Sequence, residues 1–173
     1  MATVAGEGGG EAPASPPAPL AGWRDVTAHV IAVWFGCGHL PVAPGTWGTL
    51  GAIPLYLLLR PHGPLAVAGA AVVITLIGFW AAGRVEARLG FKDPQIVVVD
   101  EVAGVLTTWI AAPPTTLALI VGFLAFRIFD VLKPWPARAA ERLRGGAGVM
   151  LDDVAAGVWG AALVLAARAA GWL

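Results

Sequence analysis

Long stretches without a charged side chain are the feature of this sequence that most restricts its fold. Asp, Glu, Lys and Arg are absent from residues 26–59, 61–83, 102–126 and 154–167. A transmembrane helix needs about 20 mainly apolar residues, and backbone groups in lipid must find their hydrogen-bond partners within the protein. The pattern therefore predicts an all-α chain whose helices lie in a lipid bilayer.

Two of these segments are long enough to cross a membrane. Residues 64–82 form a continuous apolar run, which is by itself long enough for a membrane-spanning helix. Residues 154–173 form a second span if Arg168 extends toward the headgroups and Trp172 lies at the interface, as long basic and aromatic side chains do. We expect both segments to be full membrane spans.

Two other apolar segments are short or interrupted. Residues 47–59 precede a turn at 60–63 and are too short to cross untilted. Pro113 and Pro114 interrupt the run 102–126, and a proline pair removes two amide donors and disfavours helix before it. We expect helices at 101–112 and 115–132. The predicted fold is an all-α, multi-pass membrane helical bundle with short or re-entrant helices and a polar site at its cytoplasmic face.

Composition limits the remaining possibilities. Eleven basic and eleven acidic residues give zero net charge, so no global field attracts nucleic acid. The single Cys37 allows no internal disulfide, and no Cys/His zinc pattern is present. Residues 1–22 are rich in Gly, Ala and Pro, which predicts a disordered tail, while residues 23–173 form the membrane domain.

Four polar segments, 35–49, 91–101, 126–136 and 141–153, lie between the apolar ones. In the third, Arg127, Asp130 and Lys133 are spaced by three and share one helical face. Ionisable groups beside membrane helices favour a functional interpretation. The alternative is a salt-bridged helix end in which Lys133 stabilises the last carbonyls.

Two adjacent acidic pairs, Asp100-Glu101 and Asp152-Asp153, each precede an apolar segment. Helix capping is one explanation, but a cap uses one carboxylate per helix and each site has two. Hard oxygen ligands without His or Cys suit Mg²⁺, which bridges carboxylates to phosphate. The predicted metal ligands are Asp100, Glu101, Asp130, Asp152 and Asp153.

The first polar segment is rich in glycine and runs into an apolar helix near Thr46. Amides of Gly45 and Thr46 could bind a phosphate at this helix N-terminus, although a tight turn at the membrane surface explains the glycines equally well. Cys37 and His39 have no orienting partner in the sequence, and we interpret them, like His29 and His62, as incidental.

Four motifs in this order resemble the phosphatidylglycerophosphatase A family: G-x-G-x-x-P-x-A-P-G-T-x-G-T (36–49), D-P-Q-x-x-V-x-D-E-x-x-G (93–104), F-R-x-F-D-x-x-K-P-x-P (126–136) and E-x-x-x-G-G-x-G-V-M-x-D-D-x-x-A-G (141–157). The resemblance implies Mg²⁺-dependent hydrolysis of phosphatidylglycerophosphate to phosphatidylglycerol and inorganic phosphate, on the cytoplasmic side of a bacterial inner membrane. Matching motif positions makes the candidate catalytic residues Asp93, Asp100, Glu101, Arg127, Asp130, Lys133, Asp152 and Asp153.

Two other classes of protein remain alternatives. A small membrane transporter would use Arg127 and Asp130 within a pathway, and a structural membrane subunit would use the acids only as helix caps. Residues 64–82 contain Thr75 as their one hydroxyl side chain, and the charges gather at helix ends, which favours chemistry at the interface. A shared site also requires that turns 60–63 and 112–114 lie away from all four polar segments.

Overall fold

The computed structural model describes residues 19–173. The tail predicted for residues 1–22 lies outside the described residues except for its last four positions, so it stays a prediction. Within the described part, the chain contains α-helices, 3₁₀ turns and no β-strand. The all-α prediction is confirmed.

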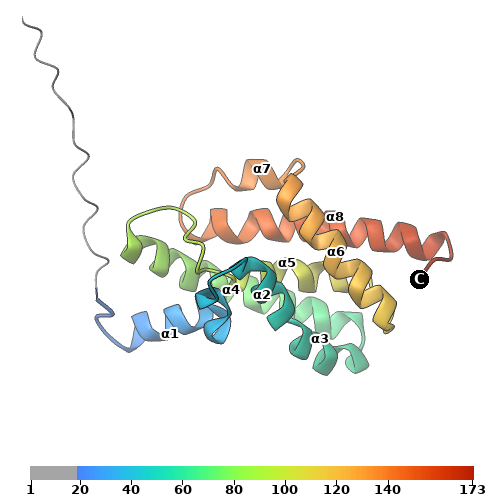
Figure 1. Cartoon of the computed structure of the whole chain (residues 1–173), viewed down its shortest axis with the longest axis horizontal. Coiled ribbons are helices and arrows are strands. Elements are labelled where there is room, and N and C mark those ends of the chain that lie inside the picture. Colours follow the sequence, from blue (N-terminus) through green and yellow to red (C-terminus); the bar gives the residue numbers. More distant parts are fainter. Residues whose placement is uncertain (1–18) are drawn as a thin grey trace, which may run out of the picture.

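The central helix of the fold is α5, which packs against α8, α4, α6 and α2. In Figure 1, α8 runs along most of the helical part and α6 crosses it obliquely. The elements are α1 Trp23–Ala32, η1 Trp34–His39, α2 Pro44–Gly51, α3 Ile53–Leu59, η2 Arg60–His62, α4 Pro64–Leu89, α5 Val99–Trp109, α6 Thr116–Leu132, α7 Ala137–Ala140 and α8 Gly146–Ala169.

Among the described helices, α4 and α8 are long and apolar enough to cross a membrane, with 26 and 24 residues. They correspond to the two predicted spans. Helix α8 begins earlier than predicted, at Gly146, so Asp152 lies at the end of its second turn and Asp153 at the start of its third. The N-cap residues of α5 and α8 are Val98 and Gly145, and neither makes a side-chain cap. Neither acidic pair therefore supplies an N-cap residue, although Asp100 Oδ1 accepts a hydrogen bond from the Glu101 amide within the first turn of α5.

The predicted helix 47–59 is instead two helices, α2 and α3, with a break at Ala52. Helix α2 starts at Pro44 because proline is well suited to the first helical turn, where its missing N–H is not needed. At the break, Trp34 Nε1 donates to the Gly51 carbonyl at 2.9 Å. This bond satisfies a carbonyl that the interrupted helix leaves free.

The proline pair separates α5 from α6 as predicted. Helix α5 has 11 residues, too few to cross the hydrocarbon core, and the Thr115 side chain caps α6 by accepting from the Ala118 amide at 3.1 Å. The α5–α6 turn and the η2 turn line one cavity together with Arg168, whose Nη1 donates to Ala111 O at 2.8 Å. Both turns therefore meet at one end of the bundle.

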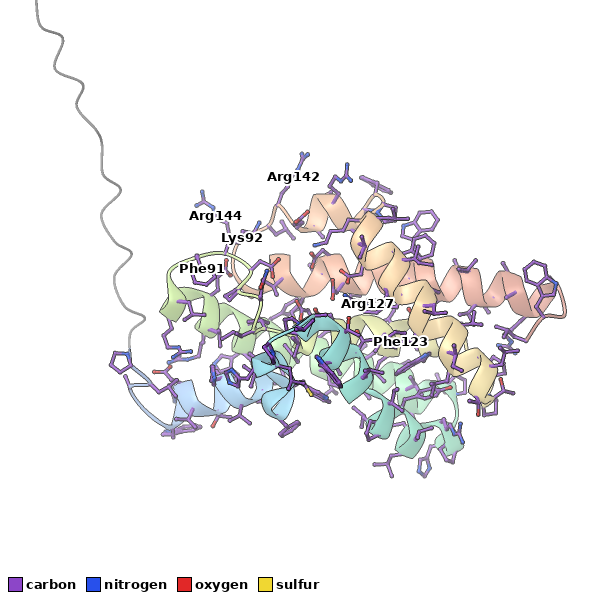
Figure 2. The ribbon with its side chains drawn as sticks, viewed as in Figure 1. Phe91, Lys92, Phe123, Arg127, Arg142 and Arg144 are labelled. Atoms are coloured by element: carbon purple, nitrogen blue, oxygen red, sulfur yellow. The ribbon has the colours of Figure 1, made fainter. Side chains whose placement is uncertain are left out.

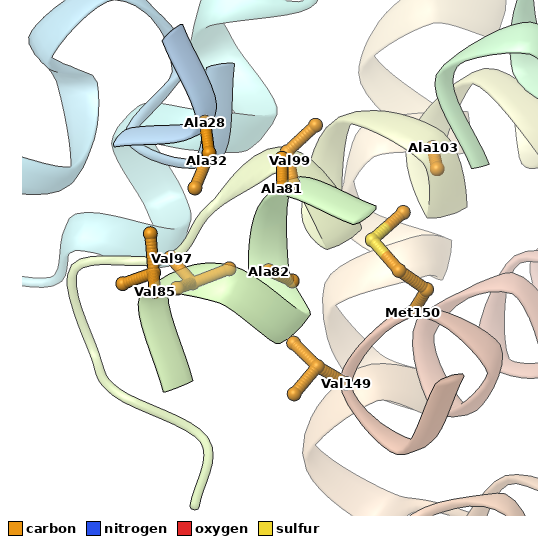
Figure 3. Packing of buried hydrophobic residues seen from close by; sticks show 10 residues of the cluster. All are labelled: Ala28, Ala32, Ala81, Ala82, Val85, Val97, Val99, Ala103, Val149 and Met150. Atoms are coloured by element: carbon orange, nitrogen blue, oxygen red, sulfur yellow. The ribbon is translucent and has the colours of Figure 1, made fainter. Parts of the chain in front are cut away.

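Small side chains allow the helices to pack closely. Ala28 and Ala32 from α1 meet Ala81 and Ala82 from α4, and Met150 from α8 completes this cluster (Figure 3). A second cluster is built around the larger side chains Tyr56, Trp109 and Phe126.

Glycines bring α5 and α8 into direct backbone contact. A Cβ on Gly157 would overlap the Gly104 carbonyl oxygen, and a Cβ on Gly104 would lie 2.7 Å from the carbonyl oxygen of Asp153. Only glycine permits this approach. The crossing places Asp153 next to the first turn of α5, where Asp100 and Glu101 lie.

Candidate active site

A cavity of about 390 Å³ lies where all four polar segments meet. Its lining contains every predicted catalytic residue: Asp93, Asp100, Glu101, Arg127, Asp130, Lys133, Asp152 and Asp153. Gly45 also lines it, whereas Thr46 does not. The Thr46 amide donates to Ala43 O at 2.9 Å and is therefore not free to bind phosphate. Gln95 was not predicted, although its place in the D-P-Q motif was an available signal.

Three carboxylates form the most compact acidic group in the cavity. Asp100, Glu101 and Asp153 each offer an oxygen within 4.8 Å of the other two. Asp100 and Asp153 are only 6% and 4% exposed, so water screens their repulsion poorly. Close approach of α5 and α8 produces this group.

The fourth and fifth acids are paired with bases instead. Lys133 Nζ donates to Asp152 Oδ2 at 2.6 Å, and Arg127 Nη1 lies 2.8 Å from Asp130 Oδ2. Of the five predicted metal ligands, the structure gathers three and places the other two beside cations. The five acids therefore form one compact group of three and two ion pairs, although the charge of Asp130 also acts on Glu101.

Buried polar atoms without partners point into the same region. Three buried side-chain atoms among the described residues make no hydrogen bond: Glu101 Oε2 and Arg127 Nη1 at the cavity, and Glu86 Oε2 on α4 away from it. The close Arg127–Asp130 contact is therefore an ion pair without hydrogen-bond geometry. A Cβ on Gly45 would overlap Glu101 Oε1 and lie 3.2 Å from Arg127 Nη1. Gly45 therefore leaves room for both groups. Buried atoms of this kind need an explanation, such as a bound ion or ligand.

Unusual backbone conformations also gather around the cavity. Ala43, Asp93 and Lys133 line it and have positive φ values of 51°, 51° and 44°. A residue held in a sparsely populated region costs on the order of 1–3 kcal/mol, and such residues cluster at functional sites. At Lys133, the left-handed conformation ends α6, while its side chain bonds to Asp152 on α8.

Burial sets the acid–base character of the groups outside the two long helices. Burial, together with the charges of Glu101 and Asp153, raises the pKa of Asp100 well above its usual range. Burial and the charge of Asp130 raise the pKa of Glu101 to about 7, although Asp100 and Arg127 oppose the shift. Burial lowers the pKa of Lys133, but the hydrogen bond and charge of Asp152 outweigh it and raise that pKa overall. A cation would favour the ionised carboxylates.

The residues present fit a hard divalent cation. Asp100, Glu101 and Asp153 converge, Glu101 Oε2 lacks a partner, and Mg²⁺ binds through a few carboxylates plus substrate phosphate and water. The groups interpreted as incidental, Cys37 and the three histidines, do not line the cavity. His29 Nε2 lies 3.1 Å from His39 Nε2 and His29 Nδ1 lies 3.1 Å from Arg88.

Clustered acids beside Arg and Lys in one cavity suit the binding of a cation and a phosphate, and two long apolar helices suit an enzyme that acts on a lipid. Residues 30–168 match the phosphatidylglycerophosphatase A family. The chain belongs to this family, and it is therefore a lipid phosphatase, a phosphoric monoester hydrolase.

Curated relatives agree with this assignment. A phosphatidylglycerophosphatase A of Escherichia coli strain K12 is 37% identical over 79% of this chain and 80% of its own length. A phosphatidylglycerophosphatase A of Haemophilus influenzae is 36% identical over 80% and 86%. A Bacteroides thetaiotaomicron protein named "Putative phosphatidylinositol-3-phosphatase" is 44% identical over 80% and 92%. No solved structure shows significant similarity to the chain.

Proposed function

We propose that this protein hydrolyses phosphatidylglycerophosphate to phosphatidylglycerol and inorganic phosphate in a Mg²⁺-dependent reaction. The observation that carries the proposal is the convergence of Asp100, Glu101 and Asp153 with Arg127 and Lys133 in one cavity. Family membership supports phosphatidylglycerophosphate as the substrate.

The basic residues bind the phosphate that is removed. Arg127 Nη1 is buried and lies 2.8 Å from Asp130 Oδ2, and the planar fork of donors that the guanidinium presents is suited to binding two phosphate oxygens. Lys133 acts as a point charge, held in place by Asp152. Asp130 holds Arg127 in place in the same way, through the ion pair between them. These two acids are positioning residues in the proposal.

The acids Asp100, Glu101 and Asp153 would hold Mg²⁺, and Asp93 lines the same cavity as a more exposed carboxylate. When bound, the ion supplies charge neutralisation for the phosphoryl oxygens and acidifies water. In the reaction, a water oxygen bonds to phosphorus while the bond from phosphorus to the glycerol oxygen breaks. The water gives up one proton to a cavity carboxylate or to solvent, and the glycerol oxygen takes up one proton as the alcohol leaves, so the protons balance.

We also propose that the protein is a multi-pass protein of the bacterial inner membrane with this cavity facing the cytoplasm. Basic residues favour the cytoplasmic side. Figure 2 shows Lys92, Arg142 and Arg144 along the edge of the molecule nearest the loops after α4 and α7. The opposite end, at the η2 and α5–α6 turns, carries Arg60 and Arg168.

The transporter and structural-subunit alternatives have less support. Among residues 19–173, six of the nine acids line one end cavity, α4 carries only Glu86 near its C-terminal end, and the C-terminal half of α8 carries none. Neither acidic pair supplies an N-cap residue. The name of the Bacteroides relative supports a second candidate substrate, phosphatidylinositol 3-phosphate. Phosphatidylinositol 3-phosphate is also a phosphate monoester on a lipid headgroup.

A phosphate-release assay tests the proposal. Purified protein in mixed detergent micelles is given phosphatidylglycerophosphate or phosphatidylinositol 3-phosphate, with Mg²⁺ present. We expect faster release from phosphatidylglycerophosphate. Faster release from phosphatidylinositol 3-phosphate would replace the proposed substrate, and no release from either would contradict the proposed reaction.

A further inference from the structure

A second groove adjoins the catalytic cavity at the end of α6. It has a volume of about 430 Å³, and its lining includes Leu132, Lys133, Trp135, Arg138 and Arg142. Lys133 lines both the groove and the catalytic cavity. The two spaces therefore meet at a cation that is already part of the proposed site.

The groove has basic groups available for an anion. Arg138 and Arg142 are exposed, and neither forms an ion pair with an acid among residues 19–173. Glu141, their neighbour in the chain, lies instead 3.6 Å from Lys133 Nζ. In Figure 2, Arg142 extends outward from the edge of the fold, whereas Arg127 lies further inside.

Apolar side chains border the same groove. Leu132 and Trp135 are 60% and 78% exposed, which is costly in water but favourable at the boundary between headgroups and acyl chains. Arginines beside exposed apolar groups suit a ligand with a phosphate attached to a lipid. A membrane lipid bound with its headgroup toward Lys133 meets both requirements.

We propose that this groove binds the phosphodiester of the substrate while the catalytic cavity holds the terminal phosphate monoester. The inference rests on the proposed function, because phosphatidylglycerophosphate carries these two phosphates on the two ends of a glycerol. Lys133, which lines both spaces, lies between the two anions. Arg138 and Arg142 are specificity-determining residues that contact no reacting atom.

Product inhibition distinguishes the two phosphate sites, because each product retains one of the two phosphate groups of the substrate. Phosphatidylglycerol keeps the phosphodiester, and inorganic phosphate corresponds to the cleaved group. In Arg138→Ala and Arg142→Ala we expect the KM for phosphatidylglycerophosphate and the inhibition constant of phosphatidylglycerol to rise about tenfold, as for loss of one charge-assisted hydrogen bond. The inhibition constant of inorganic phosphate and kcat should stay unchanged.

Arg144→Ala is the matched control, because Arg144 is exposed on the same loop as Arg142 (Figure 2) and does not line the groove. Arg144→Ala should leave unchanged kcat, the KM for phosphatidylglycerophosphate and the inhibition constants of phosphatidylglycerol and inorganic phosphate. Oleate, an anionic amphiphile without a phosphodiester, distinguishes general attraction to anionic lipid when it is added at the same mole fraction. If it inhibits as strongly as phosphatidylglycerol, or if Arg144→Ala has the same effect, the residues form a membrane-binding patch and the inference is overturned.

Unchanged constants in both groove variants would also overturn the inference while leaving the proposed function intact. Absence of phosphate release from phosphatidylglycerophosphate by the unaltered protein would instead overturn both. Because Arg138 and Arg142 are exposed and unpaired within the described residues, their replacement by alanine should not unfold the protein.

Discussion

Lys133 Nζ lies 2.6 Å from Asp152 Oδ2 and so joins the C-terminal end of α6 to the second turn of α8. The Asp152 side chain is only 5% exposed. A buried carboxylate that loses its partner keeps the cost of its own desolvation. The pair therefore contributes to the stability of the bundle as well as to the proposed phosphate site.

We expect Lys133→Met to lower both activity and stability. Removing one partner of a buried ion pair costs about 3–5 kcal/mol, and the lower part of this range applies because Lys133 is 22% exposed. Thermal unfolding in detergent measures the stability. If the pair is the cause, Asp152→Asn should destabilise the Lys133→Met background much less than it destabilises the unaltered protein, and additive effects would contradict this explanation.

Gly45→Ala should reduce activity at least tenfold. The new Cβ would overlap Glu101 Oε1 and press on Arg127 Nη1, and such overpacking typically costs about 1–3 kcal/mol. The comparison is Gly69→Ala in α4, where a Cβ has no neighbour within 4 Å. The control should keep full phosphate release, and a Gly45→Ala protein as active as the control would remove Gly45 from the proposed site.

Arg127→Lys should lose most activity although the charge is kept, because a point charge replaces a fork that binds two oxygens. Turnover of phosphatidylglycerophosphate is the measurement, compared at equal amounts of folded protein in the membrane. Cys37→Ser should retain turnover, since Cys37 does not line the cavity. The opposite pattern, with a sensitive Cys37 and a tolerant Arg127, would show that the chemistry lies elsewhere.

Removal of divalent metal should abolish phosphate release and also lower the thermal midpoint. Without a cation, Asp100, Glu101 and Asp153 must either repel one another within 4.8 Å or take up protons, as the raised pKa values of Asp100 and Glu101 indicate, and both cost stability at neutral pH. Asp153→Asn should therefore raise the midpoint of the metal-free protein while weakening the stabilisation that added Mg²⁺ provides. EDTA-treated protein with full activity, or an unchanged Mg²⁺ response in Asp153→Asn, would argue against the metal site.

The proposed topology predicts which positions are reachable from outside the cell. In a Cys37→Ser background, Gln95→Cys and Ala147→Cys should be shielded from an impermeant thiol reagent until the inner membrane is opened. The exposed residue His62, in the η2 turn at the other end, is the reference, and His62→Cys should react in intact cells. Labelling of only one of the first two in intact cells would separate the polar segments and exclude a shared site.

Local patterns predicted much of the helical framework. The two long helices and the interruption at Pro113-Pro114 follow from apolar length and from the backbone chemistry of proline. The interruption of the predicted helix 47–59 at Ala52 was missed, because Pro54 can start a helix as easily as end one. The early start of α8 was missed because Gly145 to Gly148 resemble a loop.

The sequence by itself determined which side chains could take part in phosphate chemistry, since the motif residues are nearly all of its acids after residue 90. Only the tertiary structure decided how they divide, with Asp100, Glu101 and Asp153 together and Asp130 and Asp152 beside Arg127 and Lys133. The reason is that helix periodicity and apolar length act within one segment, whereas this division depends on how closely α5 and α8 cross. Gly104 and Gly157 set that distance because neither carries a Cβ.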